Sequence, residues 1–471
     1  MNVRALALVV ACLPLVAPGA APAREAPPPL EAPKPFALAQ PSQLALANGL
    51  KATLVPLGRV PKAQVTAVLR TGAIDEGDVI GIADFTGELM KEGAGSYDAA
   101  ALANRAADLG GALSVEPGAD EIVISLDVLA ERVPDAVELL ADLLRRPRLP
   151  ASEVDRIRSN FARQIAIERA ESQAIGEEAS ARFLYGDHPY GRGFPTDRDL
   201  ARYSAEAARG FIDHQFGAQR THLYVVGKFD ASAASAAIDR SFADWTSGTP
   251  PTVNVPAPMP GHKVRVIDRP GAPQSTIIIG LTTIDPRADD FLALALANTL
   301  LGGDFISRLG QDLREDKGWT YGVQSHITAQ YRVSGWQVDT DVTTANTADA
   351  IAEIFAQIER LRREAPTQDE LRLHQNYRGG AFVINAASRF GLTSQLAFLE
   401  LHGLPQSWLV DYPTNINALT PIQVRDATQH RLVPARMSVV VVGDLAKIGA
   451  SVRALKALAG AEWVQESPAA R

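Results

Sequence analysis

The sequence predicts an α+β fold made of two related halves, and three observations indicate it. Runs rich in β-branched residues are interspersed with amphipathic stretches whose apolar residues recur at helical spacing. These runs come in groups and do not alternate strictly, which favours a mainly antiparallel sheet flanked by helices in each half. Residues 204–227 also align without a gap on residues 420–443, at one constant offset along the chain.

In the first half, one amphipathic run predicts a helix over 134–146, where Val137, Leu140 and Leu144 recur at helical spacing. Pro134 suits the first turn of this helix, because an N–H at that position would have no partner inside the helix. Three runs rich in β-branched residues predict strands at 64–72, 121–129 and 221–227.

The second half shows the same kinds of run. Its predicted strands are 264–269, 275–281 and 334–342, and its predicted helices are 288–301 and 347–364. At the same offset, the segment 150–161 also matches 366–377, since both start with proline and continue with a charged helical pattern. Each block is too long for a solenoid repeat, so an ancestral duplication explains both matches.

Composition excludes several classes of protein. The chain has 471 residues, of which 46% are hydrophobic and 21% charged, and this excludes a disordered, collagen-like or polytopic membrane chain. The net charge is −8 and no long basic run occurs, so a nucleic-acid-binding surface is not predicted. The single cysteine, Cys12, excludes a framework of disulfides within the chain.

The N-terminus predicts export. A short basic start, MNVR, precedes the apolar run ALALVVACLPLV, which is too short to span a bilayer, and APA then supplies a signal-peptidase pattern. Residues 1–23 are therefore predicted to be a signal peptide cleaved between Ala23 and Arg24, with the mature protein in a bacterial-type periplasm. The alternative is that VVAC is a lipobox and Cys12 an acylated N-terminus. No later apolar run predicts a membrane span.

Two proline-rich stretches divide the rest of the chain, because proline fixes φ and removes a backbone donor. The predicted organisation is a tether at 24–45, a first domain at 46–248, a linker at 249–261 and a second domain at 262–471.

The segment GIADFTGELMKEGAG at 81–95 predicts a helix with an acidic face. Asp84 and Glu88 are four residues apart and share a face opposite Ile82, Phe85 and Leu89. Two interpretations remain open: a solvated acidic face lining a cavity, or an adventitious site for a hard cation. No two of the eight histidines lie three or four residues apart, so no helical histidine pair can bind a metal.

The same segment resembles the zinc helix of the metallopeptidase family of pitrilysin, insulin-degrading enzyme and mitochondrial processing peptidase, whose inverted motif is H-x-x-E-H. The frame is present, but Asp84 and Glu88 stand in place of the two histidines and Gly87 in place of the glutamate base. The family's third ligand, a glutamate, aligns with Gln164, or with Arg163 after a shift of one residue. The resemblance therefore implies a degenerate zinc motif and no metal on this chain.

A second segment, LLGGDFISRLGQDLREDKGWTYGVQSH at 300–326, is similar to the C-terminal-half signature of that family. The resemblance implies that Arg314 and Tyr321 reach across an internal chamber to the substrate backbone, and both side chains are suitable donors to a developing oxyanion. They are expected at a helix end and on the strand after a turn at Gly318. Without the resemblance, an exposed arginine and a core tyrosine are the ordinary interpretation.

The resemblance also implies a clamshell arrangement of the two halves and an extended peptide substrate paired with an edge strand. The predicted edge-strand residues are Ala112, Leu113, Ser114 and Val115. A chain with the Arg/Tyr pair but without the zinc motif resembles one subunit of heterodimeric bacterial members. This implies a catalytically incomplete subunit with no cofactor of its own and a zinc-bearing homologous partner. The alternatives are a non-catalytic scaffolding homologue and a lone enzyme that uses another metal.

Overall fold

The computed structural model describes residues 36–259 and 261–464. The predicted signal peptide, Cys12 and the cleavage position between Ala23 and Arg24 lie outside the described residues. Within the described part of the chain, each half contains one six-stranded sheet with helices packed on it. No helix of the described residues is long and apolar enough to cross a membrane.

The first sheet has the strand order β1-β2-β8-β3-β7-β6. Only β2 and β8 pair in parallel, and all other neighbours are antiparallel. Its strands are β1 (Ser42–Ala45), β2 (Lys51–Pro56), β3 (Lys62–Leu69), β6 (Leu113–Pro117), β7 (Ile122–Leu129) and β8 (Thr221–Gly227). A separate pair is formed by β4 (Gly93–Ala94) and β5 (Tyr97–Asp98).

The second sheet has the strand order β11-β12-β10-β13-β9-β14. Here β9 pairs in parallel with both β13 and β14, and the other neighbours are antiparallel. Its strands are β9 (Lys263–Asp268), β10 (Gln274–Thr283), β11 (Val323–Gln330), β12 (Val333–Thr343), β13 (Ser438–Gly443) and β14 (Glu462–Trp463).

Five strands of the two sheets occur in the same order and with the same pairing directions. The equivalent pairs are β2 and β9, β8 and β13, β3 and β10, β7 and β12, and β6 and β11. Only the sixth strand differs, because β1 precedes the first half and is antiparallel, whereas β14 follows the second half and is parallel. The prediction of two related α+β halves with mainly antiparallel sheets is confirmed.

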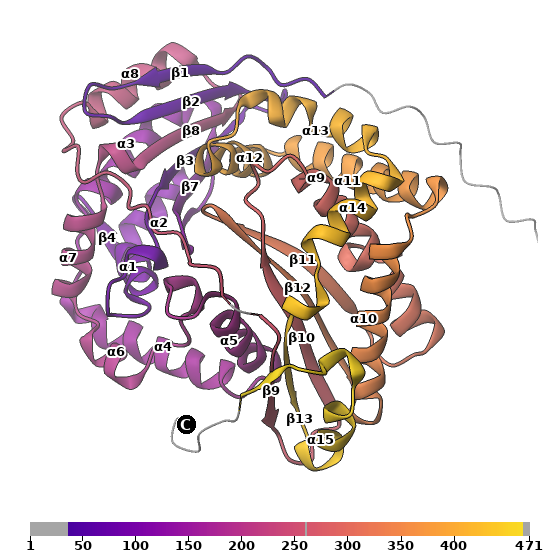
Figure 1. Ribbon diagram of the computed structural model, residues 1–471. Helices are drawn as coiled ribbons and strands as arrows, with labels where there is room; N and C mark the ends of the chain where they lie inside the picture. The colour runs from indigo at the N-terminus through magenta and orange to yellow at the C-terminus, as the bar shows by residue number, and fades with distance from the viewer. Residues whose placement is uncertain (1–35, 260, 465–471) are drawn as a thin grey trace, which may run out of the picture. The chain divides into compact units, whose positions relative to one another are not determined.

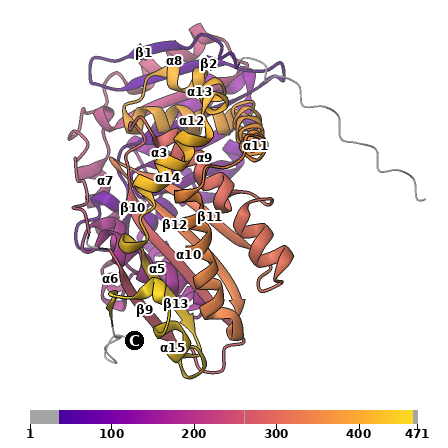
Figure 2. The same cartoon turned by 45° about the vertical axis from the view of Figure 1, so that its right-hand side comes forward.

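The helices follow the same repeat. α7 covers Ala205–Gln215 and α14 covers Pro421–Arg431, so both ends are displaced by the offset that the sequence alignment gives. The other helices of the first half are α1 (Ile82–Met90), α2 (Ala99–Asp108), α3 (Val133–Arg145), α4 (Val154–Glu168), α5 (Ser172–Tyr185), α6 (Asp197–Arg202) and α8 (Ala231–Phe242). Those of the second half are α9 (Phe291–Asn298), α10 (Thr347–Arg363), α11 (Gln368–Ala386), α12 (Arg389–His402), α13 (Gln406–Ala418) and α15 (Leu445–Arg453). Figure 2 shows α10 running along the second sheet.

One helix of each half packs on the sheet of the other half. α5 contacts β10 and β13, whereas α12 contacts β3 and β8 (Figure 1). The two helices are repeat equivalents, since α5 displaced by the same offset would cover 388–401. The exchange buries apolar side chains of both halves together, so it ties the halves to each other.

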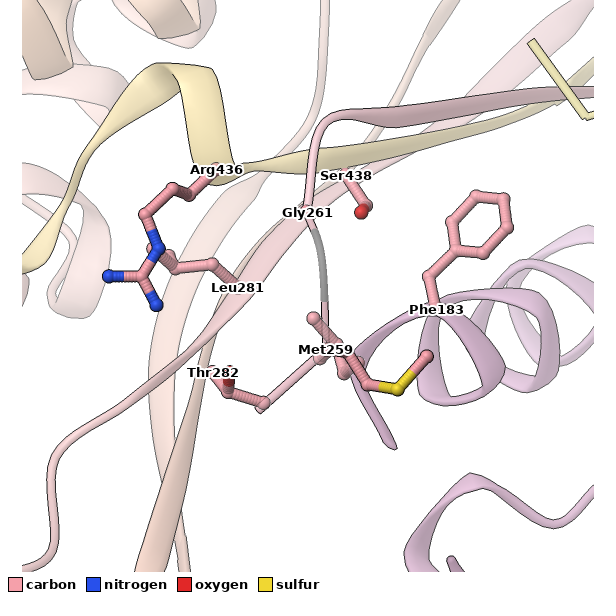
Figure 3. A pocket seen from close by; sticks show the side chains of 8 residues that line it. Phe183, Met259, Gly261, Leu281, Thr282, Arg436 and Ser438 are labelled. Atoms are coloured by element: carbon pink, nitrogen blue, oxygen red, sulfur yellow. The ribbon is translucent and has the colours of Figure 1, made fainter. Parts of the chain in front are cut away.

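The contact between α5 and the second sheet is tightly packed. A Cβ atom added to Gly176 of α5 would lie 2.8 Å from Cδ1 of Ile278, so glycine permits the close approach. Phe183 and Met259 line the small cavity that remains there, which measures about 10 Å³ (Figure 3). A cavity of this size holds at most about one water molecule, so it is not a substrate site.

The two proline-rich stretches differ in structure. The predicted tether at 24–45 includes β1, which is hydrogen-bonded along β2, so its last residues belong to the first sheet. Within the predicted linker, residues 249–259 contain no helix or strand. Arg220 of the first half binds the start of this linker, since its Nε donates to the carbonyl oxygen of Thr249 at 3.0 Å.

Candidate functional site

The helix that resembles the family's zinc helix, α1, is fixed at its N-terminus by a buried carboxylate. Glu76 accepts hydrogen bonds from the backbone N–H groups of Gly81 and Ala83, at 3.0 and 3.1 Å. Gly81 has a φ of 80°, a left-handed conformation that favours glycine. Burial raises the pKa of Glu76 to about 7, although these two hydrogen bonds act in the opposite direction.

The acidic face of α1 is exposed, as the helical spacing predicts. Asp84 and Glu88 are exposed, whereas Phe85 and Leu89 are fully buried. Glu88 forms an ion pair of 2.6 Å with Lys91. Desolvation by the surrounding protein raises the pKa of Asp84 to about 6, and the negative charges of Glu88 and Glu168 add to this effect.

The position that the resemblance assigns to the catalytic base, Gly87, has no room for a larger side chain. Gly87 is buried, and a Cβ atom added to it would lie 2.7 Å from Cγ of Pro117 and 3.4 Å from Cγ1 of Val115. Both contacts come from the edge strand β6, which packs against α1. A glutamate at position 87 would therefore require β6 to move.

The residue that aligns with the third zinc ligand lies on the neighbouring helix α4. Gln164 is exposed, and its amide nitrogen donates to Glu168 at 3.0 Å. The side chains at the four aligned positions are therefore two exposed carboxylates and one amide, and the fourth position is a glycine. A catalytic zinc site requires nitrogen or sulfur ligands and a base, so these residues do not fit one. Within residues 36–259 and 261–464, no three His, Cys, Asp or Glu side chains are grouped closely enough to hold a metal ion.

The predicted substrate-binding strand lies at the edge of the first sheet. Leu113, Ser114 and Val115 belong to β6, which is the last strand in the order, while Ala112 directly precedes it. The hydroxyl of Ser114 donates to Glu116 at 2.6 Å.

The predicted Arg/Tyr pair lies beside a π-helical segment of the second half, η7 (Gly310–Asp316). Arg314 is on this segment. The sequence predicted Tyr321 on the following strand, but it lies in the loop before β11. The loop is fixed by Thr320, whose hydroxyl donates to the carbonyl oxygen of Gly322 at 2.8 Å. The side chain of Tyr321 is 96% exposed, so it is not a core tyrosine.

Arg314 is held by an aromatic residue that the sequence reasoning missed. Its guanidinium lies 3.4 Å from the ring centre of Phe305, and Nη2 donates to the carbonyl oxygen of the same residue at 3.2 Å. Phe305 is 73% exposed although it is a large apolar residue. An aromatic residue in a glycine-rich loop shortly before an arginine of the motif is a sequence signal that could have indicated this stacking.

Comparisons with known proteins identify similar sequences and folds. The family description "Insulinase (Peptidase family M16)" matches residues 59–194, and "Peptidase M16 inactive domain" matches residues 202–377. A crystal structure of a peptidase M16 inactive domain from Pseudomonas fluorescens is similar with a TM-score of 0.80 and 23% identity, covering 86% of this chain and 98% of that one. A protease from Helicobacter pylori is similar with a TM-score of 0.78 and 17% identity, covering 86% and 100%.

Sequence relatives point to the same family. An uncharacterized zinc protease of Mycobacterium leprae is 24% identical over 408 residues, which cover 85% of this chain and 91% of the relative. An uncharacterized zinc protease of Bacillus subtilis is 22% identical over 347 residues, covering 72% and 83%. With the duplicated fold and both halves matched, the chain belongs to the M16 family of insulinase-like peptidases.

Proposed function

We propose that this chain is the subunit without zinc of a two-chain M16 peptidase. In this account a homologous partner holds the zinc ion, and Arg314 and Tyr321 of this chain bind the backbone of an extended peptide beside that ion. The chain would also contribute β6 as an edge along which the peptide pairs.

The observation that carries the proposal is the exposure of Tyr321. A tyrosine usually buries most of its ring, so a side chain that is 96% exposed beside a fixed backbone needs an explanation. Arg314 is placed seven residues earlier on η7, with its guanidinium stacked on Phe305. A phenol and a guanidinium are donors suited to a carbonyl oxygen that gains negative charge.

The first half supports the proposal that the zinc ligands and the base come from a second chain. Gly87 has no side chain with which to take a proton from water, and Pro117 occupies the space that a base would need. Hydrolysis by this chain alone therefore lacks both a zinc ligand set and a base. A partner that supplies both would complete the site.

The test is to coexpress the chain with a zinc-bearing homologue and to change Tyr321→Phe or Arg314→Lys. Tyr321→Phe keeps the ring and removes the hydroxyl, whereas Arg314→Lys keeps the charge and removes the planar fork. Loss of one donor to an oxyanion typically lowers kcat by ~10²–10³. We expect such a loss in both variants, measured on a quenched peptide, with the complex intact by gel filtration.

Matched controls separate this effect from a general loss of structure. Tyr377→Phe changes another exposed tyrosine, and Arg182→Lys changes an exposed arginine of the first half. Both controls should keep wild-type kcat. Wild-type kcat in Tyr321→Phe and Arg314→Lys would refute the catalytic role and leave the scaffolding alternative.

We also propose that the mature chain begins near Arg24 and is located in the periplasm. The support is the short apolar run followed by APA in the sequence. Intact-mass measurement of natively exported protein tests this proposal. A mass that corresponds to an acylated Cys12 start would show instead that the chain is a lipoprotein.

A further inference from the structure

A cleft of about 400 Å³ lies between the end of the linker and the second half. Its walls come from residues 255–258, the end of β10, the start of β12 and the segment from the end of α14 to the short turn η9 (Pro434–Arg436). The volume is within the range of ligand sites. Neither Arg314 nor Tyr321 lines this cleft, so the proposed function does not use it.

The side chains that line the cleft are of two kinds, basic and apolar. The basic ones are Arg332, His430, Arg431 and Arg436, and none of the described residues in the wall is acidic. The apolar part of the wall includes Val255 of the linker, which is 46% exposed, together with Ile284 and Val333. A ligand that fits both parts carries a negative charge and an apolar group.

Carboxylates near the cleft neutralise only part of its positive charge. Arg431 donates to Asp290 at 2.7 and 3.1 Å. Arg332 lies 3.7 Å from Asp285, which is paired more closely with Arg287, at 2.8 Å. Three guanidinium groups therefore share two carboxylates, so a net positive charge remains even before the last arginine of the wall is counted.

That last arginine, Arg436, indicates which kind of anion fits (Figure 3). Its guanidinium has no hydrogen bond or ion pair within the described residues. Its repeat equivalent, Arg220, lies at the end of a similar turn, η5 (Ala218–Arg220), and its Nη1 donates to a carboxylate oxygen of Asp75 at 2.9 Å. In the first half the chain itself thus supplies a carboxylate to this arginine, whereas in the second half the corresponding place is open to one from a ligand.

We infer that this cleft binds a small organic acid with an aliphatic chain. The carboxylate of the acid pairs with the guanidinium of Arg436, whose planar fork matches two carboxylate oxygens. The chain lies along the apolar part of the wall and removes Val255 from water. The inference goes beyond the proposed function, because it involves no residue of the proposed peptide site.

The test titrates the full chain with three probes, octanoate, octanamide and acetate, and follows binding by saturation-transfer NMR. Octanamide keeps the aliphatic chain and removes the charge, whereas acetate keeps the charge and removes the chain. We expect octanoate to bind about 2- to 5-fold more tightly than octanamide, as for an exposed ion pair. It should bind at least about 10-fold more tightly than acetate, because several methylene groups leave water.

Two variants test the two parts of the wall separately. Arg436→Gln should weaken octanoate binding by about 2- to 5-fold and leave octanamide binding unchanged. Val255→Ser should weaken the binding of both probes by a similar factor, because the apolar contact is common to them. Circular dichroism checks that each variant keeps its fold.

The matched control is Arg59→Gln, which removes another exposed arginine without a partner in the described part of the chain, here in the first half. It should keep wild-type binding of octanoate. Equal binding of octanoate and octanamide, equal binding of octanoate and acetate, or an equal loss in Arg59→Gln and Arg436→Gln would overturn the inference. These outcomes are independent of the kcat of Tyr321→Phe, which tests the proposed function.

Discussion

The two halves share a five-stranded frame, but their motif-bearing segments have opposite environments. In the first half, α1 packs against β6, and Pro117 fills the space beside Gly87. In the second half, Tyr321 projects into solvent, and η7 borders an open cleft. The two halves therefore share a strand arrangement, whereas the segments that carry the motifs differ in exposure and in contacts.

A second comparison concerns one pair of repeat-equivalent arginines. Arg220 is buried and forms an ion pair of 2.9 Å with the buried Asp75, whereas Arg436 is exposed and has no partner within the described residues. The same residue type therefore stabilises the first half and lies on the surface of the second.

The largest expected effect is a difference in the free energy of unfolding between variants of these two arginines. Arg220→Met leaves Asp75 as an uncompensated buried charge, so it should lower the free energy of unfolding by about 3–5 kcal/mol. Arg436→Met removes an exposed side chain and should change that free energy by no more than about 0.5 kcal/mol. Urea unfolding followed by circular dichroism measures both. Similar losses in the two variants would contradict the comparison.

The next effect concerns the carboxylate that caps α1. The pKa of Glu76 is about 7 in the folded chain against 4.5 in an unfolded one, so the folded chain binds the proton more tightly. The resulting stabilisation is present at low pH and is lost as pH rises from 4.5 through about 7. Glu76→Gln keeps only one of the two acceptor oxygens, so it should be less stable than wild type near pH 4.5. Between pH 4.5 and pH 8 the difference should shift in favour of the variant by up to about 3 kcal/mol.

Urea unfolding at several pH values checks this prediction. The same measurement on Glu92→Gln, a glutamate of the first half with an exposed arginine partner, is the control. A constant difference between Glu76→Gln and wild type across this pH range would show that Glu76 is already ionised throughout.

The smallest effect concerns two helical glycines. Gly87→Ala places a Cβ atom 2.7 Å from Pro117 and should destabilise the protein by about 1–3 kcal/mol. Gly210→Ala on α7 has nothing within 4 Å and should stabilise it by about 0.5–1 kcal/mol, because alanine has the higher helix propensity. Thermal unfolding compares the two. A gain in both variants would show that β6 can move away from α1 at little cost.

Much of the fold follows from local sequence patterns. The predicted strand at 221–227 matches β8 residue for residue, and the predicted helix at 134–146 matches α3 within one residue at each end. These segments have strong periodicity and clear ends, so local preference and tertiary packing agree. The constant offset between the halves also relates α5 to α12, although no pattern in either helix indicates that it packs on the opposite half.

Less of the candidate site than of the fold could be predicted from the sequence. The spacing of Asp84 and Glu88 predicts a shared exposed face correctly, because that property depends on one helix alone. The closure of Gly87 by Pro117 and the stacking of Arg314 on Phe305 depend on contacts between segments.

The central claim is that this chain retains the frame of a zinc site without the site itself. Plasma mass spectrometry on the purified chain after dialysis, with and without the zinc-bearing homologue, tests it most directly. The account predicts no stoichiometric zinc on the chain alone and zinc in the complex. One tightly held zinc ion per isolated chain would contradict it.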